Sequence, residues 1–302
     1  MKNPSVQIFK SIAQYHATYG LPQPVHPLIS VLNYNEFRKL DRNAPTTVAY
    51  DFYVINLKKN FEGKVKYGQQ YYDFDNGVMT FYAPKQILTF EMTGALPEGW
   101  TVIIHPDLLH GAPLAAKMRD YGFFSYAANE ALHLSEKEET ILEGILDNLR
   151  TETGLNTDMH TQDLIRSHID LFLNYCNRFY SRQFITRKKV SNDLLIKFEN
   201  LLHDYFTENK PGSGLPAVPY FADQLLVSKH YLNDMLKHLT GLTTQQHIQN
   251  HLIEIAKQML TTTTRSVSEI AYLLGFEHSQ SFNKFFKNKV NLTPTEFKQS
   301  FN

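Results

Sequence analysis

The chain has 302 residues, which predicts about two domains, and 42% of them are hydrophobic, enough to build sizeable cores. Lys+Arg and Asp+Glu number 30 each, so a formal net charge of zero excludes a global electrostatic attraction to nucleic acid. The single cysteine excludes an internal disulfide, no apolar run is long enough to cross a bilayer, and the first residues lack the layout of a signal peptide. These features together predict a cytoplasmic protein.

Short strands are predicted for most of the first hundred residues. Residues 5–19 predict a short helix that ends at Gly20, and three prolines between positions 22 and 27 then interrupt regular structure. Large apolar residues recur at every second position over 48–54, where a strand is expected. Further candidate strands, separated by turn signals, are Lys64–Phe74, Val78–Tyr82, Gln86–Met92 and Trp100–Ile104. Short strands at this spacing predict a small antiparallel barrel or sandwich.

Two helices are predicted within residues 135–190. Ser135 and Glu138 form a capping box at the start of the first helix, and Gly154 marks its end. In the second helix, apolar residues recur four and three positions apart, close to a heptad seam: Ile165, Ile169, Phe172, Cys176 and Phe179. The pattern predicts a helical pair that joins two subunits. The basic stretch Arg178–Lys189 is interpreted as a solvated surface, with a phosphate-facing role as the alternative.

From about residue 191 every pattern is helical, and a first helical hairpin is predicted over Val218–Gly241. Pro219 suits the first turn of a helix, and Ser228 can cap the helix that follows. A helix from about Thr243 to Leu260 then connects this hairpin to a second one.

The second hairpin lies between Ser266 and about residue 298. Ser266 and Glu269 make a capping box, and Gly275 allows the left-handed backbone that stops a helix. A second helix begins near Ser279 and keeps Phe282, Phe285, Phe286 and Val290 on one side. Two short helices joined by a tight, glycine-containing turn are the sequence form of a helix-turn-helix.

The run I-A-x-x-L-G-F-x-x-x-x-x-F-x-x-x-F-K over 270–287, followed by L-T-P-x-x-F-K over 292–298, resembles the second helix-turn-helix of the AraC/XylS family of bacterial transcription regulators. With the first hairpin and the connecting helix, the resemblance covers about Leu194 to Phe297. The chain departs from the family at Asn291, where glycine is usual, and at Asp234 and His251, where arginine is common. Asparagine tolerates the left-handed conformation, so the turn at Asn291 is expected to survive.

The resemblance implies an α+β protein of two domains. Residues 1–134 are expected to form a small antiparallel β-barrel of the cupin-like kind that senses an effector or pairs subunits. Residues 135–190 are expected to be the helical pair, and residues 191–302 the all-α DNA-binding domain with a double helix-turn-helix.

Residues at the start of each second helix are the predicted DNA readers, because that part of a recognition helix reaches base edges in the major groove. Short polar side chains and cations gather there. The predicted readers are Ser228, Lys229, His230, Asn233 and Lys237 in the first hairpin, and Ser279, Gln280, Ser281, Asn283, Lys284 and Lys287 in the second. Residues 192–302 carry ten Lys+Arg and ten Asp+Glu, so contact must come from local geometry and not from bulk charge. A hairpin that only packs is the alternative.

Candidate chemistry in the barrel is sparse. His105, Asp107 and His110 could be drawn as metal ligands, but the His-x-His pair and following glutamate expected of a metal cupin are absent, so a structural loop is favoured. Asp73 and Asp75 suit turn chemistry. The aromatic residues are expected in the core, with some lining an apolar ligand pocket: Tyr50, Phe52, Tyr67, Tyr71, Phe81 and Trp100.

The predicted function is therefore a sequence-specific, effector-responsive transcription regulator that is not an enzyme and uses no cofactor or metal. Its expected partners are double-stranded DNA, a second copy of the chain, a small-molecule effector and RNA polymerase, with no membrane. The alternatives are a ligand-independent dimeric regulator and a cupin-type barrel enzyme with a helical interaction tail.

Overall fold

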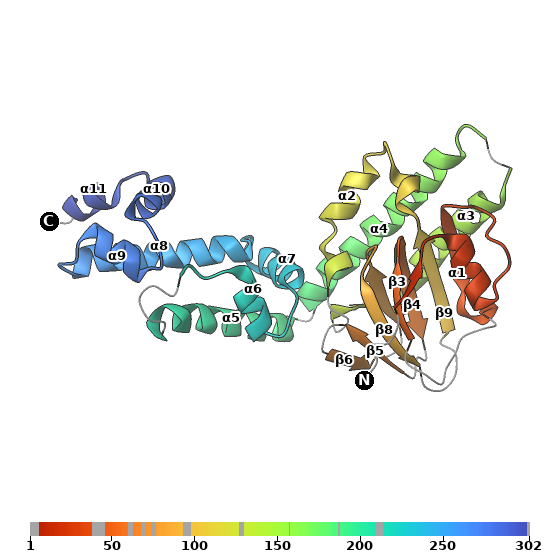
Figure 1. Cartoon of the computed structure of the whole chain (residues 1–302), viewed down its shortest axis with the longest axis horizontal. Coiled ribbons are helices and arrows are strands. Elements are labelled where there is room, and N and C mark those ends of the chain that lie inside the picture. The colour runs from red at the N-terminus through yellow and green to blue at the C-terminus, as the bar shows by residue number, and fades with distance from the viewer. Residues whose placement is uncertain are drawn as a thin grey trace. The chain divides into compact units, whose positions relative to one another are not determined.

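The computed structural model describes residues 6–37, 46–59, 63–67, 70–73, 77–92, 98–126, 130–156, 158–186, 188–208 and 214–300. The chain divides into two compact units, Met1–Thr186 and Arg187–Asn302 (Figure 1). The first unit contains sheets and helices, and the described residues of the second are helical, in agreement with the predicted α+β class. A further division of the first unit at residue 135 stays a prediction.

The described strands of the first unit form two five-stranded sheets. The first sheet has the order β1 (Gln7–Phe9), β3 (Thr46–Tyr50), β8 (Ile87–Met92), β5 (Gly63–Tyr67) and β6 (Gln70–Asp73). The second has the order β10 (Leu132–His133), β7 (Val78–Tyr82), β4 (Tyr53–Lys59), β9 (Glu98–Ile104) and β2 (Ile29–Asn33). None of the described pairings joins one sheet to the other, so the described strands show two sheets and not a closed barrel.

The N-terminal segment differs from its prediction as a single helix over 5–19. Residues Gln7–Phe9 form β1, which pairs in parallel with β3, and this is the parallel pair in an otherwise antiparallel set. Helix α1 (Ile12–Tyr19) begins only after Ser11, whose side chain accepts a hydrogen bond from the Gln14 amide. Phe9 is fully buried, and its ring lies 5.5 Å from that of Tyr50. Burial of this ring favours a strand where local periodicity favours a helix.

A second difference concerns the predicted strand Lys64–Phe74. Residues 63–67 and 70–73 form an antiparallel hairpin, β5 and β6, in place of one strand. Strands β7, β8 and β9 lie close to the predicted ranges because each has a turn signal before it.

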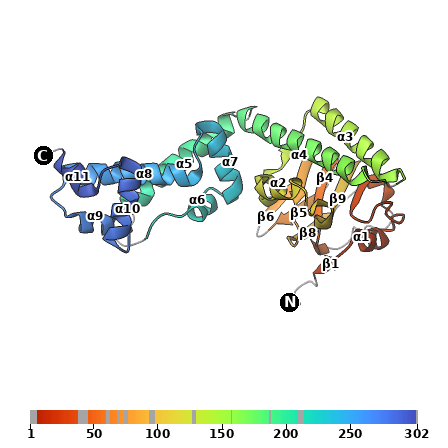
Figure 2. The ribbon, with the colours of Figure 1, turned by 90° about the horizontal axis from the view of Figure 1, so that it is seen from above.

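Helices cover the outer face of the second sheet. They are α3 (Glu136–Gly154), which contacts β2, and α4 (Thr161–Thr186), which contacts β10 and runs across the sheet (Figure 2). The short helix α2 (Leu114–Asp120) follows β9 and the turn after it. The predicted capping box of Ser135 and Glu138 starts α3. None of the helices in the described part of the chain has the length and apolarity of a membrane span.

The predicted heptad seam of α4 faces this sheet. Ile165, Ile169, Phe172, Cys176 and Phe179 are all buried. The ring of Phe172 lies 5.8 Å from that of Trp100 in β9, which places the seam against its own subunit. These side chains are therefore occupied within the chain, and the pairing of two subunits through this helix stays a prediction.

Part of the basic stretch at the end of α4 is also structural. The Arg182 guanidinium donates to both carboxylate oxygens of Glu138, at 2.9 and 2.7 Å, and to the carbonyl of His133. These bonds tie α4 to the start of α3, which leaves Arg182 little freedom to meet a phosphate. Arg187 lies outside the described residues.

The three loop residues considered as metal ligands cap the end of β9. The amide of Asp107 donates to the His105 ring at 3.3 Å, which starts a short 3-10 helix, η2 (Pro106–Leu109). The carboxylate of Asp107 lies 3.4 Å from Nδ1 of both His105 and His110. Among the described residues, no group of three or more His, Cys, Asp and Glu side chains is placed to hold a metal ion. Asp75 lies outside the described residues, and of Asp73 the structure describes only the backbone, in β6.

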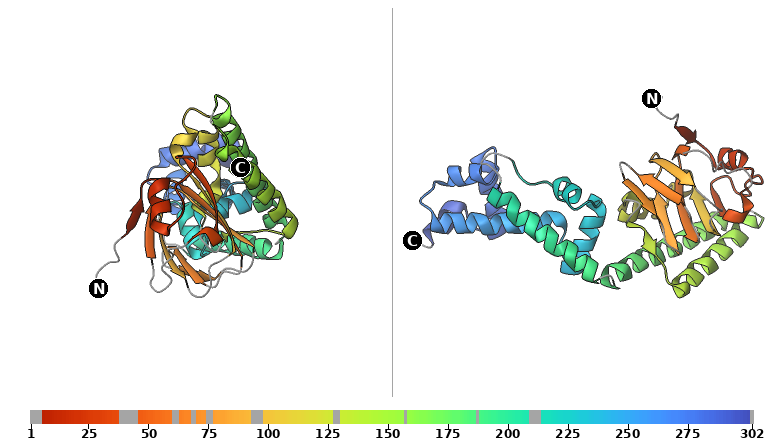
Figure 3. Two further views of the ribbon diagram at one scale, coloured as in Figure 1. Left: turned by 90° about the vertical axis from the view of Figure 1, so that its right-hand side faces the viewer. Right: turned by 90° about the horizontal axis from the view of Figure 1, so that it is seen from below.

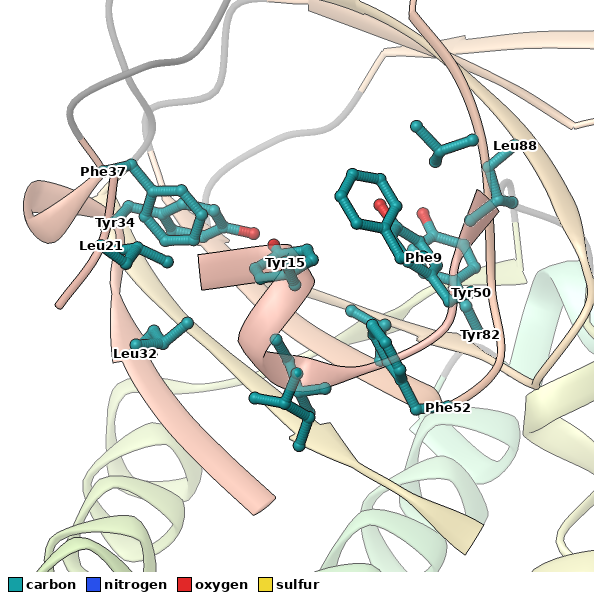
Figure 4. Close-up of a cluster of buried hydrophobic side chains, with 14 residues drawn as sticks. Phe9, Tyr15, Leu21, Leu32, Tyr34, Phe37, Tyr50, Phe52, Tyr82 and Leu88 are labelled. Carbon is teal, nitrogen blue, oxygen red and sulfur yellow. The ribbon is translucent and has the colours of Figure 1, made fainter. Parts of the chain in front are cut away.

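The space between the two sheets is filled mostly by aromatic and aliphatic side chains. Phe9 and Tyr50 come from the first sheet, and Val54 and Tyr82 from the second. In this cluster Tyr34 and Phe37 lie at one side, and Phe9, Tyr50 and Tyr82 at the other (Figure 4).

One cation is buried with them. Lys58 of β4 is 6% exposed, and its ammonium lies over the Phe90 ring, 5.4 Å from the centroid. Burial lowers the pKa of Lys58 from its ordinary 10.5 to about 8, because the charged form loses hydration. The unfolded chain therefore binds more protons than the folded chain between these two values, and the free energy of unfolding rises with pH across that window.

We predict that Lys58→Met raises the free energy of unfolding by about 1–3 kcal/mol at pH 7, because the folded state no longer holds a desolvated charge. The rise in stability expected for the native chain between about pH 8 and pH 10.5 should be absent in this variant. Urea unfolding at a series of pH values measures both effects.

The neighbouring Lys59→Met is the control, because Lys59 pairs with Glu139 and Glu143 on the opposite face of the sheet. A native pH dependence that persists in Lys58→Met would contradict the assignment of the effect to Lys58.

Candidate nucleic-acid interface

The second unit is built from α5 (Lys188–Glu208), α6 (Val218–Gln224), α7 (Lys229–Thr240), α8 (Thr244–Thr262), α9 (Val267–Leu273), α10 (Ser279–Val290) and α11 (Pro294–Gln299). Helix α8 runs between two helix pairs, α6 with α7 and α9 with α10 (Figure 3). In each pair a helix of 7 residues precedes one of 12 residues. The described unit therefore contains the same two-helix arrangement twice.

Both 12-residue helices end in the left-handed conformation. Gly241 follows α7 with a φ of 77°, and Asn291 follows α10 with a φ of 61°. The amide of each donates to a carbonyl in the last helical turn, at 2.9 Å in both cases. The prediction that Asn291 preserves the turn is confirmed. Thr243 and Thr293 then cap the next helices, each through a capping box.

The turn between α9 and α10 requires glycine. Ser266 and Glu269 form the predicted capping box at the start of α9. Gly275 has a φ of 90°, and a Cβ atom there would lie 2.2 Å from the carbonyl oxygen of Gly214. Because that oxygen belongs to the backbone, it cannot move aside as a flexible side chain would. The turn and the segment before α6 are thus packed backbone to backbone.

Phenylalanines hold the inner face of α10. Phe282 and Phe286 are fully buried, and their ring centroids lie 5.7 Å apart. Phe276 in the turn and Phe297 in α11 contact them, at 5.3 and 5.5 Å between centroids. Such a cluster fixes the rotation of α10 about its own axis, because any other rotation exposes large aromatic surface.

The outer face of α10 carries the predicted readers of the second hairpin. Gln280, Ser281, Asn283, Lys284 and Lys287 are exposed, and Ser279 is partly exposed. Within the described part of the chain, no hydrogen bond or ion pair engages the side chains of Gln280, Asn283, Lys284 or Lys287. Polar and cationic groups on this helix are therefore available to an external partner.

Unlike the cations on the outer face of α10, Lys298 makes hydrogen bonds within the protein. Its ammonium donates to the carbonyl of Arg265 at 2.8 Å and to that of Thr263 at 3.3 Å. It fastens α11 to the loop before α9 and is a structural residue.

The first pair differs, because two of its predicted readers make internal bonds. Ser228 caps α7 by accepting from the Tyr231 amide at 3.1 Å. Asn233 accepts from the Thr244 amide at 3.3 Å and so ties α7 to the start of α8. Lys229 and Lys237 are exposed.

His230, the remaining predicted reader of the first pair, is partly buried. Burial, followed by the nearby Lys229 charge, lowers the pKa of His230, while Asp234 acts in the opposite direction. The neutral imidazole is therefore favoured at pH 7, and His230 supplies no cation there.

Sequence reasoning missed a shallow groove beside the start of α10. It has a volume of about 500 Å³ and is lined in part by Tyr272, Glu277 and His278. Tyr272 is 58% exposed on α9. Its position on the polar side of the α9 pattern is the signal that could have indicated a surface role.

The residue His251 of α8, which departs from the family pattern, is partly buried. Its ring is 5.6 Å from that of Phe206, and its Nε2 atom is buried without a hydrogen-bond partner. Burial and the neighbouring His203 lower the pKa of His251, so a neutral ring occupies this place.

We predict that Gly275→Ala destabilises the second unit by about 2–4 kcal/mol, because the methyl group would both strain the backbone and collide with Gly214. Gly241→Ala is the matched control, since its φ of 77° is also left-handed but the added methyl would meet open space. We expect that change to cost about 1 kcal/mol. Urea unfolding of the full chain, followed by the helical circular dichroism signal, compares the two. Equal losses would contradict a tight turn at Gly275.

Comparison with known proteins concerns mainly this second unit. Residues 221–300 match the sequence family described as "Helix-turn-helix domain". The HTH-type transcriptional activator RhaS of Escherichia coli (strain K12 / DH10B) is 35% identical over 78 residues, which cover 26% of this chain and 28% of that protein. The match thus spans little more than a quarter of the length of these curated relatives.

Solved structures show weaker likeness. An AraC-type transcriptional regulator from Chromobacterium violaceum is 21% identical over 37% of this chain and 96% of that chain, with a TM-score of 0.33. ToxT from Vibrio cholerae is 14% identical over 90% of this chain and 98% of that chain, with a TM-score of 0.29. The identification of a helix-turn-helix domain therefore depends on the sequence matches of the second unit and not on these structures. Residues 221–300 thus carry a helix-turn-helix domain of the kind found in AraC/XylS-type transcription regulators.

Proposed function

We propose that this chain is a sequence-specific DNA-binding transcription regulator whose first unit responds to a small-molecule effector. The observation that carries the proposal is the outer face of α10, where unengaged amides and ammonium groups lie on a helix fixed by buried phenylalanines. A rigid helix with a free polar face is what reading of the major groove requires.

The side chains on α10 suit different parts of the DNA. Gln280 and Asn283 can each pair with adenine through two hydrogen bonds, donating to N7 and accepting from N6. Lys284 and Lys287 suit guanine or backbone phosphates. The amides would therefore choose the sequence, while the cations would add affinity.

The two helix pairs would act as a double helix-turn-helix with unequal roles. If α7 enters the neighbouring major groove, about 34 Å along the duplex, Lys229 and Lys237 are its exposed cations. Because Ser228 and Asn233 already make internal bonds, α7 would contribute phosphate contacts more than base reading. The first pair would anchor the protein and the second would select the site.

A second copy of the chain is part of the proposal, because a domain without net positive charge binds DNA modestly and gains from a second tethered unit. The inward seam of α4 is occupied, but the same helix carries Leu164 and Leu171 on its outer side, each 46% exposed. We assign the contact between subunits to this outer side. RNA polymerase would be the further partner of a regulator bound near a promoter.

We predict that Gln280→Ala combined with Asn283→Ala relaxes sequence choice. The ratio of affinities for a duplex selected from a random pool and for a shuffled duplex should fall by about tenfold or more, because each lost amide removes about 1–3 kcal/mol of discrimination. Fluorescence anisotropy at fixed salt measures this ratio. An unchanged ratio of affinities would contradict the proposal that α10 contacts the bases.

We predict that Lys287→Ala weakens binding to the selected and the shuffled duplex by similar factors and lowers the salt dependence by about one unit. Lys289→Ala is the matched control. It removes the same charge from the same helical turn but lies about 160° further around the helix. Equal effects of the two changes would show that charge alone, and not the outer face, governs binding.

We predict that Leu164→Glu with Leu171→Glu converts a dimer to a monomer, because two desolvated carboxylates would lie in the contact. Light scattering after size-exclusion chromatography gives the mass directly. Ile87→Glu, at a 60% exposed position of β8, is the control and should leave the dimer intact. A monomeric native chain at micromolar concentration would contradict the proposed pairing.

A further inference from the structure

A groove on the second unit is lined by residues of α8 together with residues of α5 and α11. It has a volume of about 700 Å³. His251, Ile255 and Gln258 of α8 line it, and their spacing of four and three positions places them on one face of the helix. Because seven residues of an α-helix rise about 10 Å, His251 and Gln258 lie far apart along the groove. The residues that line this groove include none of the predicted DNA readers.

The walls of the groove are partly apolar. Phe206 of α5, Ile255 of α8 and Phe297 of α11 line it, and all three also pack on the buried core beneath α10. The ring of Phe206 lies 5.6 Å from that of His251. Helix α11 is bonded to the residues that follow α8, so Phe297 lies toward the Gln258 end. A groove of this size, with an aromatic ring toward each end, is typical of a small-molecule site for a flat, elongated ligand.

One polar atom in the groove has no partner. Nε2 of His251 is buried and makes no hydrogen bond. Burial and the His203 ring, 6.4 Å away between centroids, lower the pKa of His251, so the ring is neutral at pH 7. A neutral imidazole carries one acceptor nitrogen and one N–H donor. Because buried polar atoms are almost always paired, this nitrogen indicates a missing partner.

The charges around the groove cancel. Lys257 and Glu254 both line it, and the ammonium of Lys257 donates to the carboxylate of Glu254 at 2.8 Å. The amide of Gln258 is exposed, and within the described part of the chain it makes no hydrogen bond. With a paired cation and a neutral His251, the groove offers hydrogen bonds but no net charge. A neutral ligand therefore suits it better than an ion.

We propose that this groove binds an elongated, neutral hydroxyaromatic molecule. A hydroxyl group at one end would donate to Nε2 of His251, and an oxygen at the other end would accept from the Gln258 amide. The aromatic body would lie on Ile255, between Phe206 and Phe297. This site belongs to the second unit, whereas the effector of the proposed function acts on the first.

The site is coupled to the candidate nucleic-acid interface through one ring. Phe297 lines the groove, and its ring lies 5.5 Å from that of Phe286, which is buried under α10. A ligand held against Phe297 would therefore stabilise the packing that fixes α10. Only this effect on DNA binding rests on the proposed function; the site itself does not.

The test uses the full-length protein and three neutral probes: resveratrol, 4,4′-dihydroxystilbene and 4,4′-dihydroxybiphenyl. Each is compared with its fully methylated ether, whose oxygens accept hydrogen bonds but do not donate them. A ligand that binds only the folded chain raises the thermal midpoint, and isothermal titration calorimetry then gives its affinity. We expect at least one probe to bind and its ether to bind at least about tenfold more weakly, because the buried nitrogen would keep no donor.

Two variants locate the site. His251→Phe keeps an aromatic ring but removes the acceptor, and should abolish the preference for the probe over its ether. Gln258→Met keeps the length of the side chain but removes the amide, and should weaken binding several-fold. Gln245→Met is the matched control, because it makes the same change on α8 outside the groove and should leave the affinity unchanged.

Failure of all three probes to bind overturns the proposal. So does equal binding of a probe and its ether, or an affinity that neither variant of the groove changes, since the probe would then occupy another place. If His251→Phe loses the helical circular dichroism signal, the exposed position of Gln258→Met decides alone.

Anisotropy with the selected duplex, in the absence of any probe, separates this proposal from the proposed function. Binding of a probe in the groove of a chain that does not bind DNA would uphold the site and overturn the regulator. DNA binding by a chain that binds none of the probes would have the opposite meaning.

Discussion

The interlocked phenylalanines beneath α10 are the constraint on which the second unit depends. Phe282 and Phe286 are buried against Phe276 and Phe297, so the rotation of α10 about its axis is fixed by apolar burial and not by its own polar groups. The polar face consequently needs no internal partners and stays free. Gly275 makes this possible, because only glycine lets the turn approach Gly214 closely enough to bring Phe276 under the helix.

The two helix pairs show how one arrangement supports different roles. In α10 the outer amides are unengaged, whereas in α7 Asn233 holds the start of α8. An internal bond of this kind strengthens the fold but withdraws a reader. In the first unit the two faces of the second sheet also differ. The outer face packs on α4 through apolar residues such as Trp100, whereas the inner face holds the buried polar residues Asn56, Thr80 and Lys58.

Local signals made much of the second unit predictable from the sequence. The capping box of Ser266 and Glu269 and the left-handed Asn291 depend on residues a few positions apart. Features that depend on distant contacts were missed. Strand β1 forms because Phe9 packs on Tyr50. The apolar seam of α4 packs on the second sheet, and the periodicity of the α4 sequence alone does not indicate which element covers that seam. The bond from Asn233 to α8 and the buried pair of Asn56 and Thr80 likewise depend on elements that lie far apart in the chain.

The most direct measurement of the central claim is a crystal structure of the full chain with a duplex selected from a random pool. The account predicts that α10 lies in the major groove with Gln280 and Asn283 at base edges and Lys287 near guanine or a phosphate. It also predicts that Phe282 and Phe286 remain buried as they are in the free chain. A complex in which α10 lies outside the groove, or in which another surface of the second unit contacts the bases, would contradict it.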